Sequence, residues 1–501
     1  MKKIIAIFGL SVLFVSCSDD DPITDPTEPT PITYTSGSAD FTKYVSVGNS
    51  LTAGYSDNAL FIDGQTASYP NMLASNFALV GGGDFKIPFM ADNLGGLTLG
   101  GSALDGFGNR LYLSFATGSP NPIPVSGNGS TEVTNVVAGP FNNMGVPGAH
   151  SYHLIAPGYG NVQALPNANP YFIRMASSPN STVLADAVSQ NATFFSLWIG
   201  SNDILGYALV GGDAEDHNST GNLDPATYGR NDITNTNTFA SVYGGILAAL
   251  TSNDADGVVA NIPDVTAVPY FTTVPYNPVP LDAPTAGFLN SASAYGAYNG
   301  GLAQLNGLGL LSDEELAKRT INFSAGASNA VVIFDEDLTD LTIYNPALTN
   351  MRQATADDLI VLTARSFIGT LADPNNPSSV NGVGVPLADK WVLTPEEQLS
   401  VTNAVTEYNQ VIATLAAQYN LAIVDANAYL NNVATTGVSL SDGSSVTATY
   451  ATGGAFSLDG VHLSPRGYAL VANLFIKSIN TKYGSDLPGV NPLDYKGLYI
   501  N

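Results

Sequence analysis

Residues 44–55, with the sequence YVSVGNSLTAGY, decide the fold class of this chain. The first four residues form a short β-prone run, which ends in the turn-forming residues Gly48, Asn49 and Ser50. Residues 51–55 and 69–77 then favour helices. A strand, a sharp turn and a helix in succession are the start of an α/β unit.

The strand-to-helix pattern recurs further along the chain. Residues 194–199 form an apolar run typical of a buried strand, and residues 258–262 repeat it with weaker flanks. Thr394 begins a helix as its N-cap, with Pro395 at the first helical position and Glu397 at the third, and that helix leads into a strand at residues 421–424. Ser464 caps the last helix. Strands that alternate with helices predict a parallel sheet covered on both faces, an α/β/α arrangement of three layers.

Two long segments interrupt this alternation and are predicted as insertions. Residues 81–142 are rich in Gly, Asn and Ser, and residues 281–390 show no clear period. The folded domain is then expected to span residues 41–485, with residues 486–501 as a C-terminal tail. Apolar residues of the first insertion predict either a lid over a binding site or a small satellite core: Leu97, Leu99, Leu104, Phe107, Leu111, Tyr112, Leu113 and Phe115.

Composition excludes several classes of protein. Of the 501 residues only 12% are charged, while 50 are glycine and 30 are proline, so a coiled coil or helical solenoid is excluded. With 42 acidic and 16 basic side chains the formal charge is −26, and the electrostatic field of this charge repels nucleic acids. A hydrophobic fraction of 45% is too high for a disordered chain, so the protein is expected to fold.

The N-terminus predicts export and a lipid anchor. Two lysines precede the apolar residues 4–15, which is the pattern of a secretory signal peptide, here expected over residues 1–16. Cys17 follows directly and is the only cysteine, so no intramolecular disulfide can form. Residues 13–17, LFVSC, resemble the lipobox at which bacterial lipoproteins carry their lipid, although Phe14 is a less usual residue there. An ordinary signal peptide with an incidental cysteine is the alternative.

The residues after Cys17 predict where the protein is anchored. Residues 18–21, SDDD, resemble the acidic signal that sends lipoproteins of the Bacteroidetes to the outer face of the outer membrane, with a merely solvated acidic run as the alternative. Residues 17–40 are rich in Pro, Thr and Asp and favour an extended tether. The resemblance implies a surface-exposed outer-membrane lipoprotein of a Gram-negative bacterium, held to the membrane through the lipid on Cys17.

Four histidines are present, and one of them follows a carboxylate at a useful spacing. In residues 459–462, DGVH, one turn can aim Asp459 at Nδ1 of His462 and leave Nε2 free. A serine hydrolase needs this arrangement for its general base. A structural or solvated pair is the ordinary alternative.

Three further stretches supply groups for the same chemistry. Ser50 ends the first predicted strand, so its hydroxyl is expected at the carboxyl edge of the sheet, the usual ligand site of open α/β folds. Asn202 follows the second predicted strand and can donate its amide to a developing oxyanion. Residues 143–148, NMGVPG, form a glycine loop whose N–H groups can point to the same place. Taken singly, each of these is more simply a turn.

In chain order, residues 48–55, 143–148, 200–203 and 459–462 resemble the sequence blocks of the SGNH (GDSL) hydrolase superfamily. These blocks cover few residues but follow the family order along nearly the whole chain. The resemblance implies the flavodoxin-like three-layer α/β/α sandwich of that superfamily, with a parallel sheet and with the large insertions described above.

The resemblance also assigns catalytic roles. It makes Ser50 the nucleophile, His462 the general base and then acid, and Asp459 the carboxylate that orients the imidazole. Asn49 stands where the block that names the family usually has Asp. Because that Asp is not a triad member in the family, the change is expected to affect only the hydrogen bonds of the turn.

The implied oxyanion hole consists of the backbone N–H of Ser50, the backbone N–H of Gly148 and the side-chain amide of Asn202. Gly148 is preferred because the family block is Asn, four residues, Gly; Gly145 is the alternative. Asp203 is expected to be structural.

Residues beside the oxyanion loop and acidic clusters elsewhere have open roles. His150 and His153 either line the pocket or, as expected, lie on a helix surface. Acidic clusters at residues 213–216, 254–257 and 335–337 lack the ligand spacing of an EF-hand. Solvated loops are therefore expected there, and calcium binding stays open.

The expected function is that of a cell-surface esterase or lipase, a serine carboxylester hydrolase that acts on lipid or other acyl esters through an acyl-enzyme intermediate. The implied mechanism needs no metal or other cofactor. Residues 51–55, LTAGY, look most like the bacterial lysophospholipase and thioesterase branch. Two alternatives stay open: a carbohydrate O-acetylesterase, and a non-catalytic surface lipoprotein that binds glycan or lipid.

Overall fold

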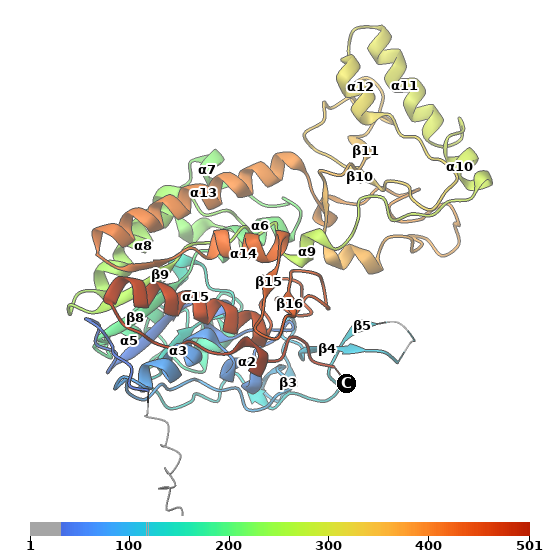
Figure 1. Cartoon of the computed structure of the whole chain (residues 1–501). Coiled ribbons are helices and arrows are strands. Elements are labelled where there is room, and N and C mark those ends of the chain that lie inside the picture. The colour runs from blue at the N-terminus through green and yellow to red at the C-terminus, as the bar shows by residue number, and fades with distance from the viewer. Residues whose placement is uncertain (1–31, 117, 119, 501) are drawn as a thin grey trace, which may run out of the picture.

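The computed structural model describes residues 32–116, 118 and 120–500 (Figure 1). The predictions of a signal peptide, of lipidation at Cys17 and of an acidic export signal lie outside the described residues. None of the helices in this part of the chain combines the length and the apolar composition that a bilayer crossing requires.

A five-stranded sheet forms the centre of the molecule, with strand order β14-β9-β8-β1-β7 and every neighbouring pair parallel. Its strands are β1 (Tyr44–Gly48), β7 (Asn143–Gly145), β8 (Phe194–Trp198), β9 (Asp256–Ala260) and β14 (Ala422–Val424). The chain begins in β1, adds β7 on one side and β8 on the other, and then continues outward to β9 and β14. The predicted α/β class and parallel sheet are confirmed.

Strand β7 is the one strand of this sheet that the sequence did not predict. The glycine loop expected at residues 143–148 begins with three strand residues, and Gly48 pairs with Gly145 at the end of this short ladder. A strand of three residues is too short to show a period-2 pattern, so its pairing with β1 becomes visible only in the fold.

Strands β1 and β8 are buried along their whole length. Gly48 lies at the end of β1, where a Cβ atom would stand 2.2 Å from Thr52 Oγ1 and 2.3 Å from the carbonyl oxygen of Trp198. Only glycine fits this approach, which lets the chain turn at once into the short helix α1 (Ser50–Ala53).

Helices cover the sheet in two groups. Helix α3 (Tyr69–Ala78) packs against α15 (Pro465–Tyr483), whereas α8 (Thr236–Leu250) and α6 (Asn202–Leu209) pack against α13 (Pro395–Gln418). Figure 1 shows α3 and α15 on one side of the strands and α8 and α13 on the other. This arrangement is compatible with three layers.

The starts of α13 and α15 are as predicted. Thr394 and Glu397 form a capping box, in which the Thr394 N–H donates to Glu397 Oε2 at 2.6 Å. Ser464 caps α15 by accepting from the Gly467 N–H at 3.0 Å.

The remaining helices and strands of the core are α2 (Ile62–Thr66), α4 (Pro170–Ile173), α5 (Val183–Val188), α7 (His217–Thr220), α9 (Pro269–Thr272), α14 (Ala426–Thr435), β13 (Val392–Leu393), β15 (Val438–Ser439) and β16 (Ser445–Val446).

The first predicted insertion lies between α3 and β7. It contains β2 (Leu97–Leu99), β3 (Ser102–Ala103), β4 (Leu111–Ser114), β5 (Asn121–Pro124) and β6 (Thr131–Glu132). Leu97 is buried in a second apolar cluster, against which Leu99, Leu104 and Phe107 pack. The satellite core is therefore the interpretation that the structure supports for these residues, whereas Phe115 is 51% exposed.

The second predicted insertion lies between α9 and α13. It contains α10 (Ala283–Leu289), α11 (Tyr295–Gly307), α12 (Asp313–Arg319), β10 (Val332–Phe334), β11 (Met351–Gln353) and β12 (Leu359–Ile360). Figure 1 shows α10, α11 and α12 as a lobe that projects from the sheet, with the N-terminal end of α13 at its base. Inside this lobe the buried Arg352 binds Asp335 at 2.5 Å and Asp358 at 2.6 Å.

Both ends of the described chain pack on the domain. The Ser38 N–H donates to the carbonyl of Tyr483 at 2.8 Å, so the last residues of the predicted tether are attached to the end of α15. In the predicted C-terminal tail, Tyr499 is buried and its ring lies 5.6 Å from that of Phe61.

Candidate active site

The four sequence blocks meet at the carboxyl edge of the sheet. Ser50 begins α1 and is separated from the end of β1 by one residue, Asn202 begins α6 just after β8, and residues 146–148 follow β7. Because these strands are parallel, the loops after them lie at the same edge, which is where open α/β folds bind ligands. Residues 459–462 come from the loop before α15 and complete the group.

Ser50, His462 and Asp459 are joined by two hydrogen bonds. Ser50 Oγ lies 2.9 Å from Nε2 of His462, and His462 Nδ1 lies 3.0 Å from Oδ2 of Asp459. The side chains of His462 and Asp459 are 17% and 10% exposed, so the pair is partly shielded from water. A hydroxyl, an imidazole and a carboxylate in this order form the arrangement that activates a nucleophile.

Asp459 is held by backbone donors as well as by the imidazole. Its Oδ1 accepts from the N–H groups of Val461 and His462, each at 2.8 Å, and its Oδ2 accepts from the Asn58 N–H at 2.9 Å. Burial acts to raise the pKa of this carboxyl, but the charge of His462 and these hydrogen bonds outweigh burial and hold the pKa well below its usual value. Asp459 is therefore ionised at neutral pH.

Tyr55 packs against the imidazole of His462. The two ring centroids are 4.6 Å apart, and the Tyr55 carbonyl accepts a hydrogen bond of 2.7 Å from Tyr468 on α15. From the sequence, Tyr55 was recognised only as part of the motif at residues 48–55, and no role was predicted for it. The Tyr55 ring therefore restricts the movement of the imidazole on the side that it contacts.

The turn before Ser50 keeps its cap although Asn49 replaces the usual Asp. Oδ1 of Asn49 accepts from the Leu51 N–H at 3.0 Å and so caps α1. An amide oxygen is sufficient for this hydrogen bond. The Ser50 N–H, at the first position of α1, has no partner within the helix and is free to bind an anion.

In the loop of residues 143–148, hydrogen bonding distinguishes Gly148 from Gly145. The Gly145 N–H donates to Oδ1 of Asn143 at 2.9 Å, so this donor is already engaged. Among the described residues no acceptor takes the N–H of Gly148, which adopts a positive φ of 79°. The geometry thus favours Gly148 over the alternative. Nδ2 of Asn202 gives one hydrogen bond of 2.8 Å to the Ala149 carbonyl, which leaves its second proton for another acceptor.

Asp203 is structural, as predicted. It is fully buried, and its two oxygens accept from the N–H of Ser151 at 2.8 Å and from the Ser151 hydroxyl at 2.6 Å. These bonds fasten the segment after the oxyanion loop to the start of α6. Burial raises the pKa of Asp203 to about 6.

The expectation of surface histidines beside the oxyanion loop is wrong for His150. Its side chain is buried, and burial lowers its pKa to about 3, so the ring is neutral. His153 is half-buried; its ring stacks on Tyr159 at 4.6 Å, and its Nδ1 accepts from the His150 N–H at 3.1 Å. Aromatic side chains from the following turn cover both histidines, and a local sequence pattern does not reveal such packing.

A turn formed by Asp57 and Asn58, which the sequence did not predict to be near the site, supports the loop of residues 457–462. Oδ1 of Asp57 accepts from the Leu458 N–H at 2.9 Å, and the Asp57 N–H donates to Ser457 Oγ at 2.9 Å. Together with the bond from Asn58 to Asp459, these contacts position the loop that carries the carboxylate. Asp-Asn is a turn signal, but its partners lie some 400 residues further along the chain.

Helix α9 connects this loop to the second insertion. The Tyr270 N–H, in α9, donates to the carbonyl of Gly460 at 2.9 Å. The hydroxyl of Tyr270 lies 3.2 Å from Oγ1 of Thr363, which belongs to the insertion. Through Tyr270 the insertion is therefore linked to the loop that carries Asp459 and His462.

Replacing Asp57 by asparagine is expected to change how stability depends on pH. The amide can keep both side-chain hydrogen bonds, accepting from Leu458 and donating to the Ser56 hydroxyl, but it cannot ionise. Burial raises the pKa of Asp57 to about 7 in the folded protein, whereas an unfolded aspartate titrates near ~3.9. The folded state holds this proton more tightly, so the free energy of unfolding of the unchanged protein falls as the pH rises between these two values.

The Asp57→Asn variant escapes this loss. Its free energy of unfolding, relative to that of the unchanged protein, is expected to rise by on the order of 2 to 4 kcal/mol between about pH 4 and pH 8. Urea unfolding across this range measures the effect, with Asp105→Asn, a change of an exposed aspartate, as the control. Parallel pH curves for the Asp57 variant and the unchanged protein would contradict the prediction.

Comparisons with protein-family models, with curated proteins and with solved structures found no match for this chain. The functional argument therefore depends on the residues and on their geometry.

Proposed function

We propose that this protein is a serine carboxylester hydrolase that acts on acyl esters and has the SGNH hydrolase fold. The observation that carries the proposal is the pair of hydrogen bonds from Ser50 to His462 and from His462 to Asp459, at 2.9 and 3.0 Å. The sheet order and the two groups of helices are compatible with the flavodoxin-like sandwich that the sequence resemblance implies. The tether and Cys17 extend the proposal to a lipoprotein of the outer-membrane surface.

The proposed reaction begins when Ser50 Oγ attacks the carbonyl carbon of the ester while His462 Nε2 takes the hydroxyl proton. Asp459 stabilises the resulting imidazolium. The tetrahedral intermediate collapses as the bond to the leaving alcohol breaks, and His462 gives its proton to that alcohol. Water then attacks the acyl group on Ser50, again with His462 as base, and the carboxylic acid is released.

Three donors are proposed for the oxyanion: the N–H groups of Ser50 and Gly148 and the free amide proton of Asn202. They come from the loops after β1, β7 and β8, at one edge of the sheet. Each such donor typically contributes about 2.7 to 4 kcal/mol of transition-state stabilisation. The bond from Asn202 to the Ala149 carbonyl fixes the amide before the substrate arrives.

Aromatic side chains favour esters with long acyl chains. Tyr55, which contacts His462, meets Tyr171 edge-on with ring centroids 6.5 Å apart, and Tyr171 meets Phe107 of the first insertion at 5.7 Å. This row of rings leads from the triad to the satellite core; Tyr171 is only 5% exposed, so an acyl chain would contact the partly exposed Tyr55 and Phe107. Aromatic carbon offers an acyl chain apolar contact area, whereas an O-acetyl group is too short to use it. A carbohydrate O-acetylesterase is the second candidate.

Hydrolysis of p-nitrophenyl esters from acetyl to palmitoyl by the purified protein tests the proposal. We expect kcat/KM to increase with chain length, because longer chains bury more apolar surface. Phe107→Ala should lower kcat/KM about tenfold for the long esters but not for acetate, while Phe115→Ala, which changes an exposed residue of the same insertion, should have no effect. A preference for acetate would favour the O-acetylesterase, and no turnover of any ester would contradict the proposed function.

A further inference from the structure

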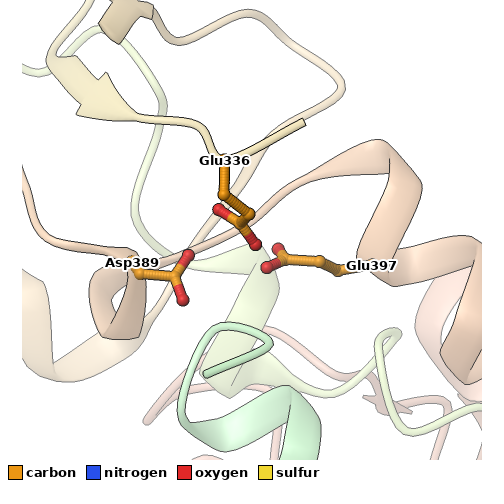
Figure 2. A group of neighbouring side chains, drawn as sticks. All are labelled: Glu336, Asp389 and Glu397. Atoms are coloured by element: carbon orange, nitrogen blue, oxygen red, sulfur yellow. The ribbon is translucent and has the colours of Figure 1, made fainter. Parts of the chain in front are cut away.

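Three carboxylates outside the proposed active site converge from separate segments of the chain. Glu336 follows β10, Asp389 begins the 3₁₀ turn Asp389–Trp391, and Glu397 lies in the first turn of α13. Figure 2 shows the three side chains pointing toward one another. One oxygen from each lies within 4.8 Å of the oxygens from the other two.

Two of these oxygens are buried without a hydrogen-bond donor in the described part of the chain. Glu397 is only 4% exposed; its Oε2 serves the capping box with Thr394, but its Oε1 has no partner. Oδ1 of Asp389 is likewise without a partner. A Cβ atom at Gly212, which has a positive φ of 82°, would stand 1.9 Å from Glu397 Oε1, so only glycine admits this carboxylate. Buried acceptors of this kind require a proton or a cation.

No basic side chain described here forms a salt bridge with any of the three carboxylates. Lys318 instead binds the residues that precede Glu336 and Glu397 in the sequence, Asp335 at 3.5 Å and Glu396 at 3.3 Å. Burial, and then the adjacent carboxylates, raise the pKa of both Asp389 and Glu397. Without a cation, only protons on these carboxyls can therefore offset the negative charge of the group.

We propose that Glu336, Asp389 and Glu397 bind one calcium ion, which links the second insertion to the start of α13. Carboxylate oxygens without nitrogen or sulfur ligands select a hard cation. Oxygens bound to one calcium lie at about 2.3 to 2.6 Å from it, so two of them can be separated by up to about 5 Å. The observed spacing of the three oxygens meets this limit without movement. Magnesium, with bonds of about 2.0 to 2.1 Å, requires a tighter group.

The exposure of Glu336 leaves one side of the site open to water, which calcium uses to complete six to eight ligands. Along the chain, Asp389 lies 53 residues after Glu336, and Glu397 lies 8 residues after Asp389. One ion would join these three segments at the base of the projecting lobe. Because Thr363 of the same insertion contacts Tyr270, and Tyr270 binds the Gly460 carbonyl, calcium is expected to stabilise the attachment of the insertion to this loop. The proposal does not depend on ester hydrolysis.

Terbium luminescence and calcium titration of the full chain test the site. Terbium(III) replaces calcium on carboxylate oxygens and is excited through a nearby tryptophan, and Trp391 belongs to the same 3₁₀ turn as Asp389. We expect tryptophan-excited terbium emission that calcium displaces, and one calcium ion per chain by isothermal titration. Trp391→Phe should abolish the emission without abolishing calcium binding.

Glu336→Gln is the decisive variant, because Glu336 is exposed and is not required for folding by any described hydrogen bond. We expect this variant and Asp389→Asn to lose calcium affinity at least tenfold, whereas Glu396→Gln, which removes the neighbouring charge paired with Lys318, retains it. With calcium, the Tm of the unchanged protein should be higher than that of Glu336→Gln. With EDTA, the variant should have the higher Tm, because it lacks one of the repelling charges. No saturable calcium binding at millimolar concentration, binding unaffected by Glu336→Gln, or tighter binding of magnesium would each overturn the proposal.

Discussion

Replacing Ser50 by alanine is expected to lower kcat for ester hydrolysis by on the order of 10⁴ to 10⁶. The variant retains the base and the oxyanion donors but has no nucleophile to form an acyl-enzyme. The Ser50 hydroxyl contacts only His462 among the described side-chain hydrogen bonds, so its removal should leave the fold intact. Steady-state hydrolysis of a p-nitrophenyl ester measures the loss, and circular dichroism checks the fold.

A fluorophosphonate reagent provides a second measurement that does not depend on knowing the natural ester. It should add one group to the unchanged protein, on the peptide that contains Ser50, and none to the alanine variant. Ser201→Ala is the matched control, since Ser201 lies at the same edge of the sheet and its Oγ has no partner among the described residues. Labelling or turnover that survives in Ser50→Ala would remove the serine mechanism.

Short patterns in the sequence were sufficient to predict those elements whose signals lie within a few neighbouring residues. The run YVSV marks β1, and the capping box of Thr394 and Glu397 marks the start of α13, because each pattern lies within a few residues. Strand β7 was missed because it has three residues and depends on pairing with β1. The burial of His150 was missed because packing by the fold, and not local spacing, determines it.

The candidate site was predicted only in part for the same physical reason. Ser50 and His462 are 412 residues apart, so composition and spacing could not bring them together, and the resemblance to a known family supplied that step. The support from Asp57 and Asn58 has no local signal beyond a turn. At the carboxylate group, Glu336 was visible in an acidic run, whereas Glu397 was identified only as a helix cap. Contacts over long sequence separations decide these positions.

Replacing Asp459 by asparagine is expected to lower kcat by on the order of 10³ to 10⁴. The reason is that the backbone donors around Asp459 determine the orientation of the amide that replaces the carboxylate. Oδ1 of Asp459 accepts from two N–H groups, those of Val461 and His462. The amide oxygen of asparagine must take this position, because an NH₂ group there would face two donors. The NH₂ group is then placed against His462 Nδ1 and against the Asn58 N–H.

An NH₂ donor at that position requires Nδ1 of His462 to accept, so the proton of the neutral imidazole moves to Nε2. Nε2 then donates to Ser50 Oγ and can no longer remove its proton. The NH₂ group of the substituted side chain also faces the Asn58 N–H, and this contact between two donors should lower the stability of the loop. We expect kcat to fall far more than KM rises, since the imidazolium loses its carboxylate in the transition state.

A second histidine–aspartate pair offers a matched control for this change. His217 Nε2 lies 2.9 Å from Oδ2 of Asp232, and its Nδ1 lies 3.0 Å from the Thr220 hydroxyl, so both ring nitrogens are engaged away from Ser50. Asp232→Asn alters the same kind of hydrogen bond and should leave kcat per folded molecule within about twofold of the unchanged protein. If Asp459→Asn retained kcat within tenfold of the unchanged protein, the carboxylate would not be orienting a catalytic base, and the role proposed for His462 would fail with it.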